Sequence, residues 1–129
     1  MIQIMSTYGS LLLRAMGQTL LLALCGLLFG TLLGMIFGIL SVVKNKVCNV
    51  IAMVFVDVVR GVPMIVLAMF VFFGVPYCLN NMMGMGVPLT ALQAGTICLA
   101  LNCGAYMAEI IRAGIESVDK GQMEAARSL

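Results

Sequence analysis

Long runs of apolar residues, separated by short polar stretches, dominate the pattern along the chain. No charged residue occurs between Arg14 and Lys44, and this run exceeds the roughly 20 apolar residues that a helix needs to cross a hydrocarbon core. A second uncharged run extends from Gly61 to Ala108 and is too long for one helix. Several breakers interrupt it and predict a hairpin loop over 74–88, namely Pro76, Asn80, Asn81, Gly84, Gly86 and Pro88.

The pattern predicts an all-α integral membrane protein with three transmembrane helices, over residues 15–43, 50–73 and 89–112. Residues 113–129 form a polar tail. The composition agrees, because 63% of the residues are hydrophobic and only 9% are charged, which excludes a water-soluble domain.

The positive charges predict the orientation of these helices. Lys44 and Lys46 flank the first connection, and Arg112, Lys120 and Arg127 follow the third helix, whereas the second connection has no charge. Positively charged loops stay on the cytoplasmic side of the membrane. We therefore expect a multi-pass protein of the cytoplasmic membrane with its N-terminus outside and its tail in the cytoplasm.

Metal binding and disulfides are not expected. The five cysteines are scattered, there is no histidine, and no Cys-x-x-Cys pair occurs. Met82, Met83 and Met85 lie near Cys78 and offer soft ligands of the kind that suit Cu(I), but we interpret them as apolar filler in a loop. We predict no metal and no cofactor in this chain, and no nucleic-acid partner.

Four glycines recur at a spacing of four in the first predicted helix: Gly26, Gly30, Gly34 and Gly38. This spacing keeps them near one face, where the absence of side chains lets a neighbouring helix approach closely. We predict that this face packs against protein.

Charged residues accompany the second and third helices. Pro63 predicts that the second helix kinks or begins there, since proline cannot donate a backbone hydrogen bond. Asp57 and Arg60 precede it at a spacing that permits an ion pair, and Glu109 and Arg112 have the same spacing near the end of the third helix. We interpret both as ion pairs at the cytoplasmic rim, and the alternative for Asp57 and Arg60 is a proton relay.

Polar residues also lie within the third helix, at Gln93, Thr96 and Asn102. Gln93 and Thr96 are three residues apart and could line an aqueous path. Hydrogen bonds between helices are an equal alternative.

Further motifs extend along nearly the whole chain. Towards its end these are Ala105-Tyr106, Ala108-Glu109-Ile110, Arg112, Gly121-Gln122 and Glu124-Ala125-Ala126, and upstream they are Thr19-Leu20 and Arg60-Gly61-Val62-Pro63. In this order and topology the chain resembles the permeases of binding-protein-dependent ABC transporters, in the polar amino-acid (His/Glu/Gln/Arg-type) branch. The resemblance implies the N-terminal part of the type I ABC importer permease fold, truncated after the EAA loop. Asp119 replaces a proline that is common in this branch, and Val62 replaces a threonine.

The tail has a physical role in this interpretation. A phosphate-binding G-x-x-x-x-G-K-[ST] loop needs a lysine preceded by glycine, and none of the three lysines has one, so energy must come from a separate ATPase. Gly121 permits a sharp turn, after which residues 122–129 read as a short helix, the coupling helix of the family. The residues expected to dock onto the ATPase are Gly121, Gln122, Met123, Glu124, Ala125, Ala126 and Arg127. The plain alternative is an ordinary solvated amphipathic end.

The resemblance implies further partners. These are two copies of an ATP-binding subunit that holds ATP and Mg, a second permease copy or homologue, an extracytoplasmic solute-binding protein, and membrane lipid. The family continues with about two more helices, so we expect that this chain alone neither transports nor stimulates an ATPase. The alternative function is a small proton- or ion-coupled carrier that titrates Asp57 and Glu109, and an enzyme is not expected because no nucleophile lies beside a base.

Overall fold

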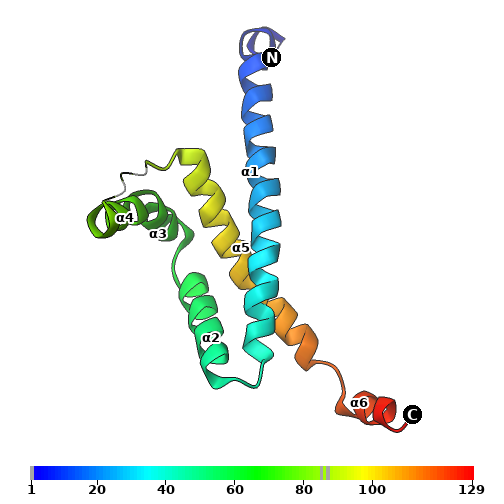
Figure 1. Cartoon of the computed structure of the whole chain (residues 1–129). Coiled ribbons are helices and arrows are strands. Elements are labelled where there is room, and N and C mark those ends of the chain that lie inside the picture. The colour runs from blue at the N-terminus through cyan, green and yellow to red at the C-terminus, as the bar shows by residue number, and fades with distance from the viewer. Residues whose placement is uncertain (1, 85, 87) are drawn as a thin grey trace.

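The structure, a computed structural model of the chain, describes residues 2–84, 86 and 88–129. These residues form α1 (Ile2–Val42), α2 (Lys46–Gly61), α3 (Met64–Met69), a π-helical turn η1 (Phe70–Gly74), α4 (Val75–Met83), α5 (Ala91–Glu116) and α6 (Lys120–Arg127). Figure 1 shows α1 as a long rod that α5 crosses, with α6 at the far end of α5. The described part of the chain contains no strand, which confirms the predicted all-α fold class.

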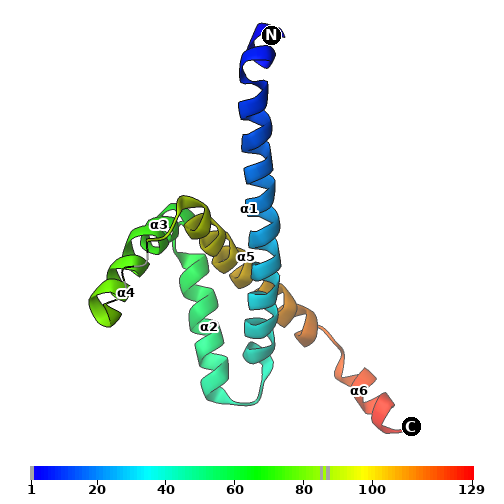
Figure 2. The same ribbon diagram turned by 45° about the horizontal axis from the view of Figure 1, so that its top comes forward.

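A seam of glycines brings α1 and α5 into close contact, and the two helices run in the same direction along it (Figures 1 and 2). A Cβ added to Gly26 would lie 2.8 Å from the Cβ of Leu99, and one added to Gly30 would lie 2.8 Å from the Cβ of Cys103. Real Cβ atoms essentially never come this close, so the helices pack backbone against side chain. In the same way Gly34 faces Met107 and Gly38 faces Ile111.

The partner residues on α5 repeat at the same spacing of four as the glycines on α1. Rows of residues four apart on one helix therefore fit between rows four apart on the other. Gly104 serves α5 in the same way, since a Cβ there would lie 3.0 Å from the Cβ of Leu33 and 3.2 Å from the carbonyl oxygen of Gly30. The face for which the sequence predicts packing against protein is the face that α5 covers.

The core is correspondingly made of small side chains. Its buried residues are Ala52, Val56 and Val59 on α2, Val71 on η1, and Ala94, Cys98, Ala100, Ala105 and Ala108 on α5. Large apolar side chains lie on the outside instead, where Leu13 is 71% and Ile65 70% exposed. Such a surface suits contact with lipid or with further protein.

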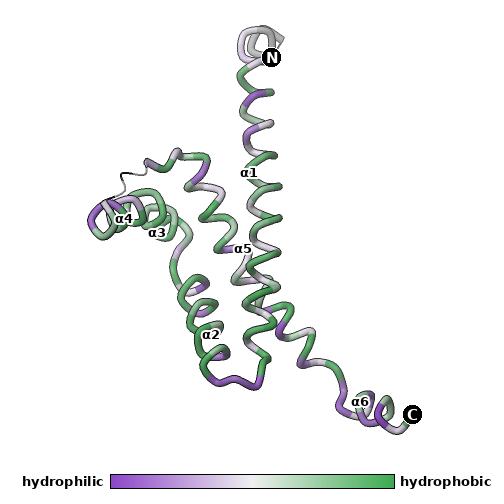
Figure 3. Tube along the Cα trace, in the orientation of Figure 1, coloured by the Kyte–Doolittle hydropathy of each residue, from purple (hydrophilic) through white to green (hydrophobic). Residues whose placement is uncertain are grey.

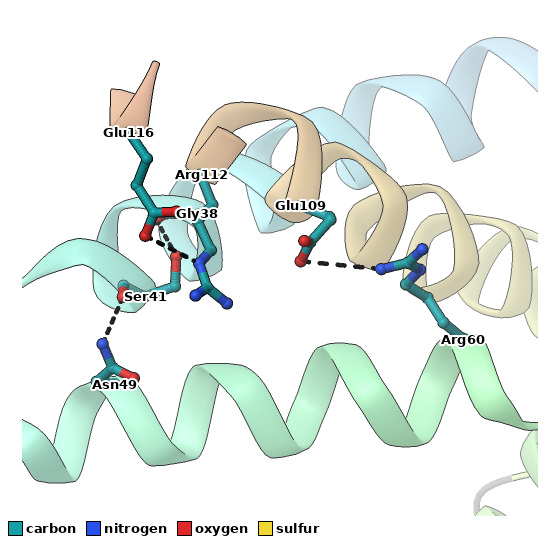
Figure 4. Close-up of polar contacts among 7 residues, drawn as sticks. All are labelled: Gly38, Ser41, Asn49, Arg60, Glu109, Arg112 and Glu116. Atoms are coloured by element: carbon teal, nitrogen blue, oxygen red, sulfur yellow. Dashed lines mark hydrogen bonds and ion pairs between the residues drawn. The ribbon is translucent and has the colours of Figure 1, made fainter. Parts of the chain in front are cut away.

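A short connection joins α1 to α2. Asn45 caps the first turn of α2 with its side chain. The side-chain amide of Asn49 donates a hydrogen bond to the backbone carbonyl of Ser41 (Figure 4). The rings of Phe37 and Phe55 stack with centroids 4.0 Å apart. These contacts hold α2 beside the end of α1.

Within the described residues, three helical stretches are long and apolar enough to cross a membrane: Thr7–Val42, Met64–Met83 and Ala91–Glu116. Figure 3 shows hydrophobic residues along most of α1, and polar residues at the α1–α2 connection and on α6. The first and third stretches overlap the spans predicted over 15–43 and 89–112.

The second stretch departs from the span predicted over 50–73. The helix breaks inside that range, since α2 ends at Gly61 and α3 begins at Met64, directly after Pro63. It then continues through η1 and α4 to Met83, so the prediction of a loop from residue 74 onward was wrong for most of its length. Two local features explain the difference.

The first feature is the position of Pro76, and the second is Gly84. Pro76 lies in the first turn of α4, where a missing backbone N–H is tolerated, and it follows the π turn, in which the N–H of Val75 bonds to the carbonyl of Phe70. Gly84, with φ +66, ends α4 in the left-handed conformation that glycine adopts at low cost.

Candidate functional site

The polar residues at the start of α5 bond locally. Thr90 and Gln93 form a capping box, in which the Thr90 N–H donates to Oε1 of Gln93 (3.0 Å) and the Gln93 N–H donates to Oγ1 of Thr90 (3.3 Å). Thr96 donates its hydroxyl to the carbonyl of Leu92 at 2.9 Å. Gln93 and Thr96 nevertheless both line an otherwise apolar cavity of about 590 Å³ between α1 and α5. Asn102 is half-buried, and its side chain makes no hydrogen bond with any described residue.

Among the described residues the charges form one ion pair between helices and one within α5, and neither is a predicted pair. Arg60 reaches from α2 to Glu109 on α5, with Nη1 3.8 Å from Oε2. Its guanidinium carbon also lies 5.1 Å from the centroid of the Tyr106 ring, within the range of a cation–π contact. Arg112 pairs with Glu116 one turn along α5, with Nε 3.2 Å from Oε1 (Figure 4).

The physical reason for this correction is the packing of α2 against α5. The last turn of α2 lies beside α5, so the nearest carboxylate to Arg60 is the one on α5 and not Asp57 three residues before it. The carboxylate of Asp57 is left without an ion pair or hydrogen bond to any described residue. In α5, the residue one full turn after Arg112 is Glu116, and a spacing of four suits an ion pair.

These charges line one small cavity between α2 and α5, which we call the charged cavity. Its volume is about 120 Å³, and its lining includes Asp57 and Arg60 from α2, Glu109 and Arg112 from α5, and the small residues Ala52 and Ala108. The charged residues of α2 and those of α5, which lie about 50 residues apart in the sequence, therefore meet in this cavity.

The tail forms α6, which stands apart from the other helices (Figures 1 and 2). Its N-cap is Asp119, whose carboxylate accepts a hydrogen bond from the Gly121 N–H at 2.9 Å. The sequence predicted a sharp turn at Gly121. The chain turns instead over residues 117–119, and Gly121 lies in the first turn of the helix. Asp119, which departs from the proline common in this branch, thus contributes a cap.

The seven residues expected to dock onto another protein all lie on or directly beside this helix, and every residue from 113 to 129 is exposed. The spacing of 3.6 residues per turn places Lys120, Glu124 and Arg127 on one face and Ala125 and Ala126 on the opposite side, with Met123 beside the charged face. A helix of 8 residues with one charged and one small apolar face is suited to a groove on a partner.

The family follows from residues 30–129, which match the model of the family described as "Binding-protein-dependent transport system inner membrane component". The chain belongs to this family. The resemblance predicted from the motifs is therefore confirmed, and the permease is a membrane component with helices long enough to cross the bilayer several times.

Relatives of the permease carry the names of amino-acid transport systems. It is 42% identical over 91 residues to the "Putative glutamine transport system permease protein GlnP" of Rickettsia prowazekii, covering 70% of this chain and 39% of that protein. It is 43% identical over 79 residues to the "Arginine transport system permease protein ArtQ" of Bacillus subtilis, covering 61% and 33%. The permease thus spans about two fifths of the length of the curated relatives it matches.

A solved structure shows the same fold. The chain of that structure, "Crystal structure of an amino acid ABC transporter with histidines", superposes with a TM-score of 0.81 at 35% identity, covering 96% of the permease and 55% of that chain. The type I ABC importer permease fold predicted from the motifs is confirmed. The named relatives are transport-system permeases, and none supports the alternative of a proton- or ion-coupled carrier.

Some residues of the site were missed by sequence reasoning. Tyr106 was noticed only as part of a motif, and Glu116 was not expected to hold Arg112; the signal for Glu116 was its spacing of four. The partners of the glycine seam also carried a signal, since they repeat at the glycines' own spacing. Met82, Met83 and Cys78 are exposed on α4, and Met85 lies outside the described residues.

Proposed function

We propose that this chain is part of the membrane permease of an ABC importer that moves polar amino acids inward across the cytoplasmic membrane, driven by ATP hydrolysis in a separate subunit. The observation that carries the proposal is α6, a capped amphipathic helix that is exposed along its whole length at the end of α5. Family membership and the glutamine and arginine systems among the relatives support the transport role and the substrate class.

In this proposal α6 is the coupling helix. Ala125 and Ala126 are small enough to let the backbone of α6 enter a groove of the ATPase, and Met123 supplies an adaptable apolar contact. Glu124 and Arg127 add polar contacts at the edge of that groove. ATP binding closes the ATPase dimer, draws the coupling helices together and opens the path outward, and hydrolysis reverses these steps.

The proposed assembly contains two ATP-binding subunits, a second permease copy or homologue, an extracytoplasmic solute-binding protein and surrounding lipid. ATP and Mg bind to the ATPase, and this chain holds no cofactor. The N-terminus lies outside and α6 lies in the cytoplasm, since Lys44, Lys46, Lys120 and Arg127 gather at that side.

Photo-crosslinking tests the docking role. A benzophenone amino acid is placed at position 126 on α6, and as the matched exposed control at position 13 on α1, in cells that make the whole transporter. We expect position 126 to capture the ATPase subunit and position 13 not to capture it. Capture of no ATPase from position 126, or an extracytoplasmic location of α6 by labelling, would refute the proposal.

The energy source is tested separately by uptake of radiolabelled L-glutamine and L-arginine. We expect uptake to stop on ATP depletion and to continue when an ionophore collapses the proton gradient. The opposite pattern would favour a proton-coupled carrier.

A further inference from the structure

Two arginines at the charged cavity are accompanied by three carboxylates. Arg60 pairs with Glu109 across the helices, with Nη1 3.8 Å from Oε2 (Figure 4). Arg112 pairs with Glu116 along α5, with Nε 3.2 Å from Oε1. The carboxylate of Asp57 lines the cavity and has no ion pair or hydrogen bond with any described residue. One carboxylate is therefore left over after each arginine has taken a partner.

Each arginine has a second carboxylate on its own helix. Asp57 precedes Arg60 by three residues on α2, and Glu109 precedes Arg112 by three residues on α5. Residues three apart lie on one face of a helix and can form an ion pair. All four residues line the charged cavity, and Figure 4 shows Arg112 extending into the space between the helices. If Arg60 takes Asp57, Glu109 becomes free for Arg112, so the number of ion pairs stays the same.

α2 is attached at its start by contacts that have no such substitute. The Asn49 side chain donates a hydrogen bond to the carbonyl of Ser41. The ring of Phe55 stacks on that of Phe37 with the centroids 4.0 Å apart. The start of α2 therefore stays beside the end of α1.

The end of α2 is attached differently, because all its polar side-chain contacts with α5 among the described residues involve Arg60. Arg60 pairs with Glu109, and its guanidinium carbon lies 5.1 Å from the centroid of the Tyr106 ring. The ion pair is 38% and 43% exposed, so it holds the helices together only weakly. The helix also breaks after Gly61, just before Pro63. The end of α2 is therefore free to swing when Arg60 releases Glu109.

The swing that separates this pair is small. α2 has 16 residues and is about 24 Å long. Turning it by about 10° about its start moves its end by about 4 Å, which takes Arg60 beyond ion-pair distance of Glu109. The residues of α2 that are buried are no larger than valine, namely Ala52, Val56 and Val59, so the movement uncovers little apolar surface.

We propose that the charged cavity is a site of ion-pair exchange, which lets the end of α2 part from α5. Arg60 passes from Glu109 to Asp57, and Arg112 then passes from Glu116 to Glu109. Each arginine keeps one partner in both arrangements, so the helices separate without leaving a guanidinium group unpaired. The carboxylate released in the open arrangement is that of Glu116, whose side chain is already 56% exposed to solvent.

Tyr106 favours the closed arrangement, in which Arg60 pairs with Glu109. Its ring contacts the guanidinium group of Arg60 from α5, so this cation–π contact exists only while α2 lies against α5. The exchange requires neither the docking of α6 nor a bound substrate, and it is therefore separate from the proposed function.

The test measures distances between α2 and α5 in the full chain in phosphatidylcholine nanodiscs. Nitroxide labels are attached to ketone-bearing non-canonical amino acids at positions 54 and 110, so that the native cysteines stay in place. Val54 and Ile110 are 55% and 66% exposed, so the labels fit without disturbing the packing. Double electron–electron resonance then gives the distribution of distances. We expect a shorter and a longer distance, for the closed and open arrangements.

The ratio of the longer to the shorter distance should respond to the carboxylates in opposite directions. Glu109→Gln should raise the ratio about two- to fivefold and Asp57→Asn should lower it by a similar factor, as expected for one exposed ion pair. Glu116→Gln should also raise the ratio, because it frees Arg112 to compete for Glu109. Glu124→Gln is the matched control, since it removes the same charge from α6, and it should leave the ratio unchanged.

Two substitutions of Tyr106 test its part in the exchange. Tyr106→Leu should raise the ratio, and Tyr106→Phe should not, because phenylalanine keeps the aromatic face. Equal effects of the two would refute this part. Asp57→Asn removes no contact of the described fold, so circular dichroism should show unchanged helix content.

Three results would overturn the exchange as a whole. These are a distribution that Glu109→Gln leaves unchanged, a shift in the same direction by Glu109→Gln and Asp57→Asn, or no response to Glu116→Gln. The assay contains no ATPase and no amino acid. Its failure would leave the proposed function standing, and failure of the ATPase crosslinking would leave the exchange standing.

Discussion

Replacing Gly30 by alanine tests the glycine seam directly. The added Cβ would lie 2.8 Å from the Cβ of Cys103, 3.1 Å from its Sγ and 3.2 Å from the carbonyl oxygen of Ala100. Carbon atoms in contact lie about 3.5–4.0 Å apart, so α1 and α5 must separate by about 0.7 Å or more at this point. Neither the Cβ nor the carbonyl can rotate away, so the helices themselves must move.

The expected cost follows from two opposing effects. Overpacking of this kind costs about 1–3 kcal/mol, and alanine regains about 0.5–1 kcal/mol over glycine within a helix. We therefore expect Gly30→Ala to lower the free energy of unfolding by about 1–2 kcal/mol. The assay is unfolding of the chain in detergent micelles by added sodium dodecyl sulfate, followed by circular dichroism.

Two controls make the test specific. Gly17→Ala lies in the same helix with nothing within 4 Å of its Cβ, so it should leave stability unchanged or raise it slightly. Cys103→Gly removes the atoms that the new methyl meets, so in a double-mutant cycle it should recover about 1 kcal/mol of the loss. Equal effects of Gly30→Ala and Gly17→Ala, or no recovery in the double variant, would show that the seam is not closely packed.

Three further predictions follow from local geometry. Asp119→Ala removes the cap of α6 and should destabilise that helix by about 0.5–2 kcal/mol, whereas Asp119→Ser should not, as hydrogen exchange at the Gly121 amide would show. Glu109→Gln should change the free energy of unfolding by less than about 1 kcal/mol, since its pair with Arg60 is 38% and 43% exposed, and a loss above 2 kcal/mol in the detergent titration would contradict this estimate. Gly84→Ala should lower the free energy of unfolding by about 1 kcal/mol in the same titration, because a residue with a Cβ is strained at a φ of +66 even where no atom lies within 4 Å of that Cβ. Gly84→Asn should lower it by less.

The sequence was sufficient for features that depend on spacing within one helix. The four glycines predicted a packing face, and Pro63 predicted the break before α3, because both follow from backbone geometry alone. The family was predictable for a similar reason, since its motifs lie in order along one stretch of chain.

Features that depend on the crossing of helices were beyond sequence reasoning. Arg60 has a carboxylate three residues before it, and only the approach of α2 to α5 shows that Glu109 is the partner. Pro76 looked like a loop residue because its place relative to a helix start cannot be read from its identity. The charged cavity combines both difficulties, and its two halves come from separate helices.

The matched spacing along the seam limits how α1 and α5 can slide. A shift of one helix by four residues, about 6 Å, would again set each glycine opposite a residue of the facing row, with one of the four matched positions lost at the end. A smaller shift would drive side chains of α5 into backbone between the glycines. The two helices therefore have a small set of discrete alignments, and any lengthwise movement between them must occur in steps of four residues, about 6 Å.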